Sequence, residues 1–153
     1  MTYIALPFNL LQLTMVIHES LRLYPPAPVV SREALEDMKF GDIQVPKGVN
    51  VRTLLVTLHQ DPDIWGPDAK DFKPERFANG SSGACKLPHV YMPFRVGPRT
   101  CLGQNLAMAE LRNLLALIVS NFSFYLSPKY GHSPALRLVM EPENGANLLI
   151  RKL

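Results

Sequence analysis

Apolar residues recur at helical spacing in two stretches of the chain. From Leu10 to Tyr24 they fall on neighbouring rows of one helix, and the prolines at positions 25, 26 and 28 predict that it ends at Tyr24. The same spacing predicts a second helix from Leu102 to Asn121. The apolar side expected for this second helix comprises Leu102, Leu106, Ala109, Asn113, Leu114, Ala116, Leu117 and Ile118.

Alternating apolar and polar positions predict short strands between and after these helices. The strands expected from this pattern are 29–32, 38–40, 43–45, 49–57, 122–126, 136–140 and 147–150. Gly41-Asp42 predicts a hairpin turn, and residues 141–145 a further turn. From His59 to Pro93 there is little periodicity, with one short helix expected near Asp63. Structureless segments of that length are uncommon in a compact domain unless they are functional.

The composition fits one mixed α+β unit over residues 1–153. Fourteen prolines exclude a chain of mostly long helices, and 47% hydrophobic with 19% charged residues exclude a disordered chain. The net charge of +3 comes from scattered basic residues, which gives no support to a nucleic-acid partner. Two cysteines, Cys85 and Cys101, exclude a disulfide framework and a zinc site with several thiolates, so we expect a reducing or cytosol-facing compartment.

The first seventeen residues do not read as a membrane span or a secretory signal. Pro7, Asn9 and Gln12 interrupt their apolar run, and both a basic leading region and a small-residue cleavage site are missing. We expect a buried helix there, entered abruptly, as in a chain whose upstream part is absent.

The candidate chemistry lies around Cys101, just before the second predicted helix. Unpaired N–H groups and the positive end of the helix dipole would face its sulfur and favour the thiolate. Gly97 and Gly103 bracket the cysteine, and glycine lets backbone approach a bulky ligand. Arg99 adds a cation able to hold a carboxylate.

Three interpretations of Cys101 follow from these residues alone. The cysteine is a haem-iron ligand, a catalytic nucleophile or an inert buried thiol. A nucleophile needs a positioned base, and neither His59 nor His89 lies in an interpretable local signature. We interpret all four histidines (His18, His59, His89 and His132) as packing or surface residues, and Cys85 as a free surface thiol.

The segment FRVGPRTCLG, residues 94–103, resembles the FxxGxRxCxG haem signature of the cytochrome P450 superfamily. Two further motifs of that family stand in the expected order, ExxR at residues 19–22 and PERF at residues 74–77. The residues around the signature are similar to those of microsomal plant members, including clans that hydroxylate isoprenoid hormones. The resemblance implies the C-terminal portion of a mostly helical fold: the ExxR helix, a meander, the cysteine loop, the haem-proximal helix and small β-sheets.

The resemblance also implies roles for single residues. Cys101 would be the axial thiolate of haem, Phe94 would shield the sulfur from water, and Arg99 and Arg32 would pair with the haem propionates, although Arg32 also suits a plain surface position. Glu19, Arg22 and Arg76 would form a structural ion cluster that fixes the meander to the first helix. Pro28, Val29 and Val30 would face substrate or belong to the core, two readings that the sequence leaves open, and the turn Glu143–Gly145 is a weaker candidate for the same pocket.

The implied activity is oxygen-dependent hydroxylation of an apolar small molecule, isoprenoid or hormone-like. Electrons would come from NADPH through a reductase that docks near Lys86, Arg95 and Arg112. Full-length relatives would sit on the cytosolic face of the endoplasmic reticulum membrane through an N-terminal anchor that this chain lacks.

Two departures from the family pattern qualify these expectations. Arg95 stands where the family commonly carries glycine or serine, which predicts weakened haem retention. The A/G-G-x-D/E-T-T motif of the oxygen-activating distal helix has no match in the chain, so the distal helical part is expected to be absent. An alternative is therefore a truncated, catalytically inactive remnant. A cysteine hydrolase is disfavoured because it lacks its base.

Overall fold

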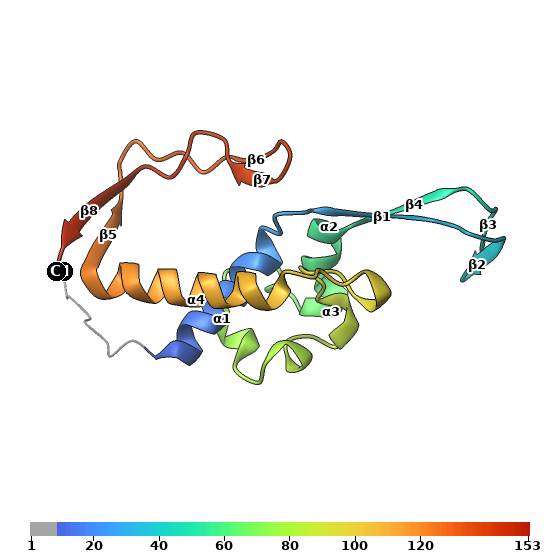
Figure 1. The fold of residues 1–153 in the computed structure, drawn as a ribbon, viewed down its shortest axis with the longest axis horizontal. Helices are drawn as coiled ribbons and strands as arrows, with labels where there is room; N and C mark the ends of the chain where they lie inside the picture. The colour runs from blue at the N-terminus through green and yellow to red at the C-terminus, as the bar shows by residue number, and fades with distance from the viewer. Residues whose placement is uncertain (1–8) are drawn as a thin grey trace.

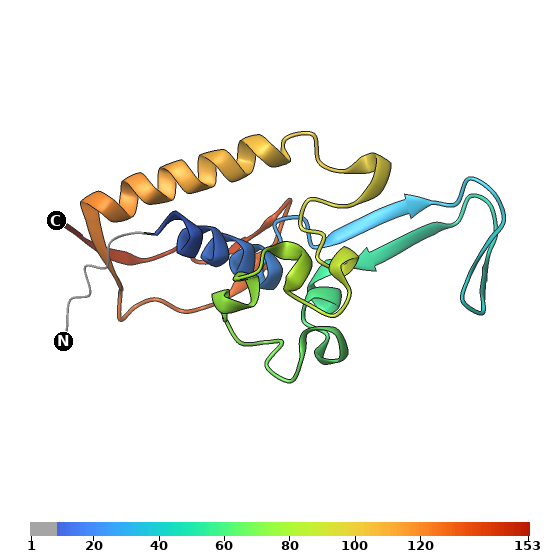
Figure 2. The same cartoon turned by 90° about the horizontal axis from the view of Figure 1, so that it is seen from below.

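The computed structural model describes residues 9–153 and is built on two long helices. Helix α1 (Leu10–Leu23) and helix α4 (Gln104–Asn121) lie against each other, as Figures 1 and 2 show from two directions. Between them the chain forms two short helices, α2 (Leu55–His59) and α3 (Pro62–Trp65). Four 3-10 turns complete the helical part: η1 (Pro74–Phe77), η2 (Ser81–Gly83), η3 (Pro88–Val90) and η4 (Gly97–Arg99).

The strands within residues 9–153 form four two-stranded antiparallel sheets. Their bounds are β1 (Val29–Glu33), β2 (Met38–Phe40), β3 (Ile43–Val45), β4 (Asn50–Leu54), β5 (Phe122–Leu126), β6 (Pro134–Leu136), β7 (Met140–Pro142) and β8 (Leu148–Lys152). β1 pairs with β4 and carries the β2–β3 hairpin at its far end, and this arm extends away from the helices in Figure 1. β5 pairs with β8, and β6 with β7. The expected mixed α+β architecture with small sheets is confirmed.

Helix α1 begins and ends where its sequence provides caps. The Asn9 side chain accepts a hydrogen bond from the Leu11 N–H at 2.9 Å, which satisfies one of the free amides at the helix start. At the other end, the Tyr24 N–H still bonds to the Ser20 carbonyl, and proline follows. Between these caps, Leu13 and Ile17 are buried in the core.

Two hydrophobic clusters hold the helical part together. Leu13 and Ile17 of α1 pack with Met108 of α4. On the other side of α1, a second cluster lies within the meander, which is the irregular segment from residue 59 to residue 93. Its members are Trp65, Ala69, Phe77 and Tyr91. Burial of one such side chain contributes about 1.5–3 kcal/mol. The meander is thus irregular in backbone but packed on its own apolar core.

Three sequence predictions of element bounds are corrected. The strand expected over 49–57 ends at Leu54, because Leu55 and His59 are buried one helical turn apart and start α2. The segment 136–140 is the turn of the β6–β7 hairpin and not one strand. Helix α4 begins at Gln104, two residues later than expected, and Leu102 lies fully in solvent.

The predicted apolar side of α4 is also corrected. The buried residue of α4 is Met108, and the half-buried Leu111, Leu115 and Ala116 pack around the same cluster. Leu106, Leu114, Leu117 and Ile118, which were expected to form the buried side, are exposed by 40–65%. The helix is therefore apolar on two sides, and the side chosen from spacing is mostly exposed, with Ala116 as its residue that packs on the core.

The chain start lies partly outside the described residues. The interruptions that we identified at Asn9 and Gln12 fall inside α1 or its cap, whereas Pro7 belongs to residues 1–8 and is not described. Within residues 9–153, no helix combines the length and the apolar composition that a membrane crossing requires.

Candidate functional site

The Cys101 loop, residues 92–103, connects the meander to α4. Cys101 is exposed and lies two residues before Gly103, the N-cap of the helix. Its N–H donates to the Phe94 carbonyl at 2.9 Å, and its carbonyl accepts from the Gln104 N–H at 3.3 Å. The backbone at Cys101 is therefore held by one hydrogen bond within the loop and one to the first residue of α4.

Two tight turns shape this loop. The Arg95 N–H donates to the Met92 carbonyl at 2.9 Å. The Thr100 N–H and hydroxyl both reach the Gly97 carbonyl, at 3.1 and 2.8 Å. Gly97 has a φ of 77°, in the left-handed region that glycine occupies without steric cost. Gly103 has a φ of −85°, so no left-handed backbone requires glycine there.

A hollow of about 230 Å³ opens beside the cysteine. Its lining residues are Ala27, Leu55, Pro93, Phe94, Arg95 and Cys101. The Phe94 ring is half-buried and packs against the Leu13–Ile17–Met108 cluster, so it is fixed from behind. An apolar wall that ends in a thiol suits a flat apolar ligand bound through sulfur.

The residues around the hollow fit the haem group that the motif implies. A Cβ atom built on Gly97 or on Gly103 would meet no atom within 4 Å, so the backbone leaves open space on both sides of the cysteine. Arg99, at the end of η4, is exposed. Arg32 on β1 is exposed too, and its guanidinium donates only to the neighbouring Ser31 carbonyl at 3.0 Å in the described part of the chain. Both cations are free to pair with carboxylates.

The structure brings Glu19, Arg22 and Arg76 together between α1 and the meander. The Arg22 Nε and the Glu19 Oε2 are 2.8 Å apart, and both side chains are completely buried. The Arg76 Nε lies 3.5 Å from the Glu19 Oε1. Arg76 also pairs with Asp68 at 2.8 Å, an acidic partner that the sequence reasoning did not identify. Hydrogen bonds from Lys73 and Arg76 lower the pKa of Asp68 to about 2.

This ion cluster is attached to the meander mainly through backbone groups. Arg22 Nη1 donates to the carbonyls of His59 and Ala69, at 2.7 and 2.6 Å. The Lys73 N–H donates to Glu19 at 2.7 Å. Because each of these partners is a peptide group, the cluster replaces the regular hydrogen bonds that the irregular meander lacks.

His59 is the positioning residue that the sequence reasoning missed. It is fully buried, and its Nε2 accepts from the Met92 N–H at 3.1 Å. The proton of the neutral ring is therefore on Nδ1, which faces the Arg22 carbonyl at 3.3 Å. His59 thus joins the C-terminal end of α1 to the first residue of the Cys101 loop. A lone histidine in an irregular segment carries no pattern that would have shown this.

The burial of His59 predicts a pH dependence of stability. Burial, opposed in part by backbone hydrogen bonds, lowers its pKa from 6.5 to about 4. Above pH 6.5 both folded and unfolded chains hold it neutral. Below that pH His59 becomes protonated in the unfolded chain but stays neutral in the folded chain. We therefore expect the free energy of unfolding to fall by about 3 kcal/mol between pH 6.5 and 4.

Urea unfolding at a series of pH values measures this effect. His59→Gln removes the titration, so its stability should change less over the same window than that of the parent. His18 contributes in the same direction, because burial and then Arg112 lower its pKa. His89→Gln, at an exposed position, is the matched control and should keep the parent's slope. Equal slopes for His59→Gln and His89→Gln would contradict the assignment.

The apolar segment around the start of β1, residues 27–30, only partly faces the hollow. Pro28 and Val30 are buried and Val29 is half-buried, and the lining residue from this segment is Ala27. Burial favours the core interpretation of Pro28 and Val30. The turn at Glu143–Gly145 is not among the lining residues either, and the Glu143 carboxylate accepts from the Ser133 hydroxyl at 2.5 Å.

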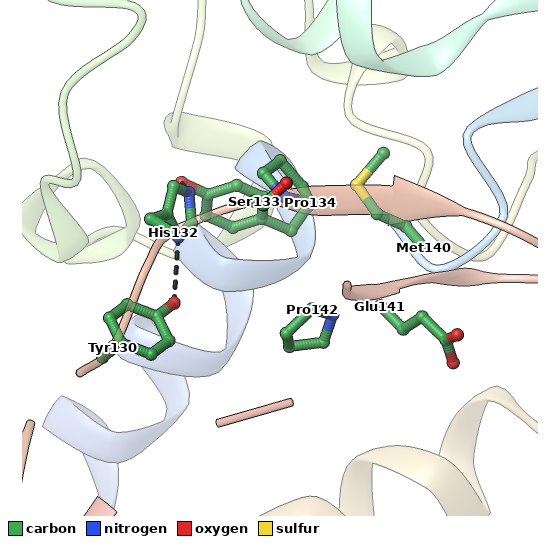
Figure 3. A pocket seen from close by; sticks show the side chains of 8 residues that line it. Tyr130, His132, Ser133, Pro134, Met140, Glu141 and Pro142 are labelled. Carbon is green, nitrogen blue, oxygen red and sulfur yellow. Dashed lines mark hydrogen bonds between the residues drawn. The ribbon is translucent and has the colours of Figure 1, made fainter. Parts of the chain in front are cut away.

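A second hollow, of about 300 Å³, lies away from Cys101 between the β6–β7 hairpin and the end of α1. Figure 3 shows Tyr130 pointing to His132 on one side and Met140 and Pro142 on the opposite strand. His132 contacts two tyrosine hydroxyls, that of Tyr130 at 3.0 Å and that of Tyr24 at 3.1 Å. Among the described residues, no cysteine, lysine or arginine lines this hollow, so it is not the site that the motif indicates.

The remaining cysteine and histidines do not supply a hydrolase. Cys85 is a free thiol, as expected, and is half-buried, and this burial raises the pKa of the thiol. His59 has no access to Cys101, since both of its ring nitrogens face backbone groups. His89 is exposed at η3 and does not line the hollow at Cys101.

Comparison with known proteins gives consistent matches. The cytochrome P450 family model matches residues 8–149. The chain is 60% identical over 137 residues to cytochrome P450 714A2 of Arabidopsis thaliana, and 59% identical over 145 residues to cytochrome P450 714C2 of Oryza sativa subsp. japonica. These matches cover 90% and 95% of the chain but 26% and 28% of the relatives. The chain is also 47% identical over 140 residues to cytochrome P450 72A397 of Kalopanax septemlobus. This match covers 92% of the chain and 27% of that protein. The chain thus spans little more than a quarter of the length of these relatives.

Proposed function

The chain belongs to the cytochrome P450 family, and from this we propose that it forms the haem-binding, thiolate-bearing segment of a monooxygenase. The resemblance to plant members that the sequence indicated is confirmed. The observation that carries the proposal is the exposed Cys101 sulfur beside an apolar hollow, on a loop that closes by hydrogen bonds at the start of α4.

The residues of the loop would hold haem in distinct ways. Cys101 would bind the iron, and Phe94, packed from behind by the α1–α4 core, would exclude water from the sulfur side. Arg99 and Arg32 would pair with the propionates, because a guanidinium matches the geometry of a carboxylate. Bound in this way, haem supplies oxygen activation, to which a thiolate ligand contributes by donating electron density to the iron.

For the complete protein we propose an apolar small-molecule substrate of isoprenoid or hormone-like character, as the resemblance to microsomal plant members of the family implies. We assign hydroxylation to the complete protein, with electrons that derive from NADPH and a location on the cytosolic face of the endoplasmic reticulum membrane.

The reductase would approach the proximal side of the loop. Arg95 borders a second depression there, formed with His18, Tyr91 and Gln104. The half-buried Arg112 lies close enough to His18 to lower its pKa, after the larger effect of burial. The third candidate, Lys86, donates to the Asp63 carbonyl at 2.8 Å and is less available. Complementary charge at this surface would mainly speed encounter.

One observation favours the alternative of an inactive remnant. Leu106, Leu114 and Leu117 leave an apolar side of α4 exposed, and large exposed apolar patches are unusual on independent domains. Turnover by the chain itself would exclude the remnant. The haem-loaded chain is mixed with NADPH and a cytochrome P450 reductase, and 7-ethoxycoumarin serves as the apolar probe. Fluorescent product excludes an inactive remnant, whereas bound haem without product is the result that both a remnant and a segment of a longer enzyme predict.

Propionate pairing by Arg99 predicts a loss that depends on the cofactor's carboxylates. We expect Arg99→Ala to weaken haem binding about tenfold, as for one charged hydrogen bond of about 1.4 kcal/mol. Haem dimethyl ester, which lacks free carboxylates, should bind the parent and Arg99→Ala equally. Lys129→Ala, an exposed cation in another loop, is the control and should not change either titration. An equal loss with haem and its ester would exclude the pairing.

A further inference from the structure

Arg95 has a backbone conformation that its side chain disfavours. Seven described residues have a φ in the left-handed region; six are glycines and the seventh is Arg95, at 64°. For a residue with a Cβ atom this region is costly, because the Cβ atom approaches the following carbonyl oxygen. The same loop contains Gly97, which is also left-handed. Glycine adopts this conformation freely at position 97, whereas arginine at position 95 does not.

The conformation of Arg95 is imposed by the hydrogen bonds that present the cysteine. The Arg95 N–H closes the turn back to Met92, and the next bond along the loop joins the Cys101 N–H to the Phe94 carbonyl. Met92 is in turn held by His59. Any relaxation of φ at residue 95 therefore acts on the two bonds that fix the Phe94 ring and the Cys101 sulfur.

The Arg95 side chain offers no compensating contact. It is exposed, and within residues 9–153 no carboxylate pairs with its guanidinium. Arg95 stands on the wall between the hollow at Cys101 and the depression on the proximal side, since it lines both. The strain is thus not offset by an ion pair within the described chain.

We propose that Arg95 is a positioning residue that weakens haem retention, because its strained backbone lowers the population of the closed Cys101 loop. This inference rests on the proposed haem-binding function. A ligand that needs one conformation binds less tightly by the fraction of molecules that hold it. A left-handed non-glycine residue lowers the equilibrium constant for closing the loop by about five- to thirtyfold relative to glycine.

Three variants separate backbone strain from the charge. Arg95→Gly removes both the Cβ atom and the guanidinium, whereas Arg95→Ala removes the guanidinium and keeps the Cβ atom. Gly97→Ala is the converse change, since its Cβ atom would meet open space and adds backbone strain alone. Hydrogen exchange of the Cys101 amide in the haem-free chain measures closure of the loop, and haem titration measures retention.

We expect Arg95→Gly to slow exchange of the Cys101 amide and to tighten haem binding, each at least fivefold. Arg95→Ala should stay within twofold of the parent in both, and Gly97→Ala should exchange at least fivefold faster. Equal effects of the glycine and alanine variants would overturn the inference and assign the effect to charge. Slower exchange in Arg95→Gly without tighter haem binding would overturn it as well. Failure of every variant to take up haem would instead reject the proposed function, and the inference with it.

Discussion

Replacing Glu19 by glutamine is expected to cost about 3–5 kcal/mol of the free energy of unfolding. The substitution keeps the shape of the side chain but leaves the fully buried Arg22 guanidinium, and Arg76 beside it, without their shared carboxylate. An exposed ion pair at the same spacing would contribute well under about 1 kcal/mol. Urea or thermal unfolding followed by circular dichroism distinguishes these magnitudes.

Glu110→Gln provides the matched control for this experiment. Glu110 lies on an exposed position of α4, so the same chemical change in a helix should alter stability by less than about 0.5 kcal/mol. If Glu19→Gln proves too unstable to fold, Arg76→Lys is the substitute. It keeps the positive charge but loses the hydrogen-bond donors to Trp65 and Asp68. Its loss of unfolding free energy should lie between the losses expected for the Glu19 and Glu110 variants. Equal unfolding midpoints for the Glu19 and Glu110 variants would show that the cluster does not stabilise the meander.

Replacing Cys101 by serine is expected to lower haem affinity by more than about 100-fold. Removal of an outer partner of a metal ligand already costs about 10–100-fold, and here the ligand atom itself is lost. The fold should be unaffected, because Cys101 is exposed and its loop bonds are made by backbone atoms. Haem titration of the parent and the variant, with circular dichroism of both, separates loss of the ligand from loss of structure.

Cys85→Ser is the control for the cysteine substitution. The Cys85 thiol is half-buried and donates to the Leu87 carbonyl at 3.2 Å, a bond that a serine hydroxyl can also make. Its haem affinity should equal that of the parent. If haem binds equally to the parent and to both serine variants, binding does not depend on Cys101.

Much of the fold was predictable because its signals are local. Proline ends α1, Gly41-Asp42 turns the β2–β3 hairpin, and each follows from steric preferences of a few residues. The prediction of a strand over 49–57 was wrong at its end, because the apolar–polar alternation continues through Leu55 and Thr57. Only tertiary burial decides that a helix begins there. The apolar side of α4 was wrong because the helix is apolar on two sides, so spacing alone could not select the buried one.

The features of the candidate site also divide into local ones, which the sequence could predict, and long-range ones, which it could not. The motif around Cys101 and the pair Glu19–Arg22 are short patterns with fixed spacing, and they could be found in the sequence. The carbonyl partners of Arg22, contributed by the meander, and the bridge through His59 depend on contacts across more than thirty residues. The left-handed backbone of Arg95 depends on hydrogen bonds of the folded loop, although the unusual residue type already indicated the position.

The central claim is that Cys101 binds the iron of haem as a thiolate, and one spectrum tests it most directly. The purified chain is loaded with haem, reduced and exposed to carbon monoxide, and its Soret band is recorded. We predict the strongly red-shifted band that thiolate ligation produces. A chain that stays colourless with excess haem, or a Soret band at the position given by a nitrogen ligand, would contradict the claim.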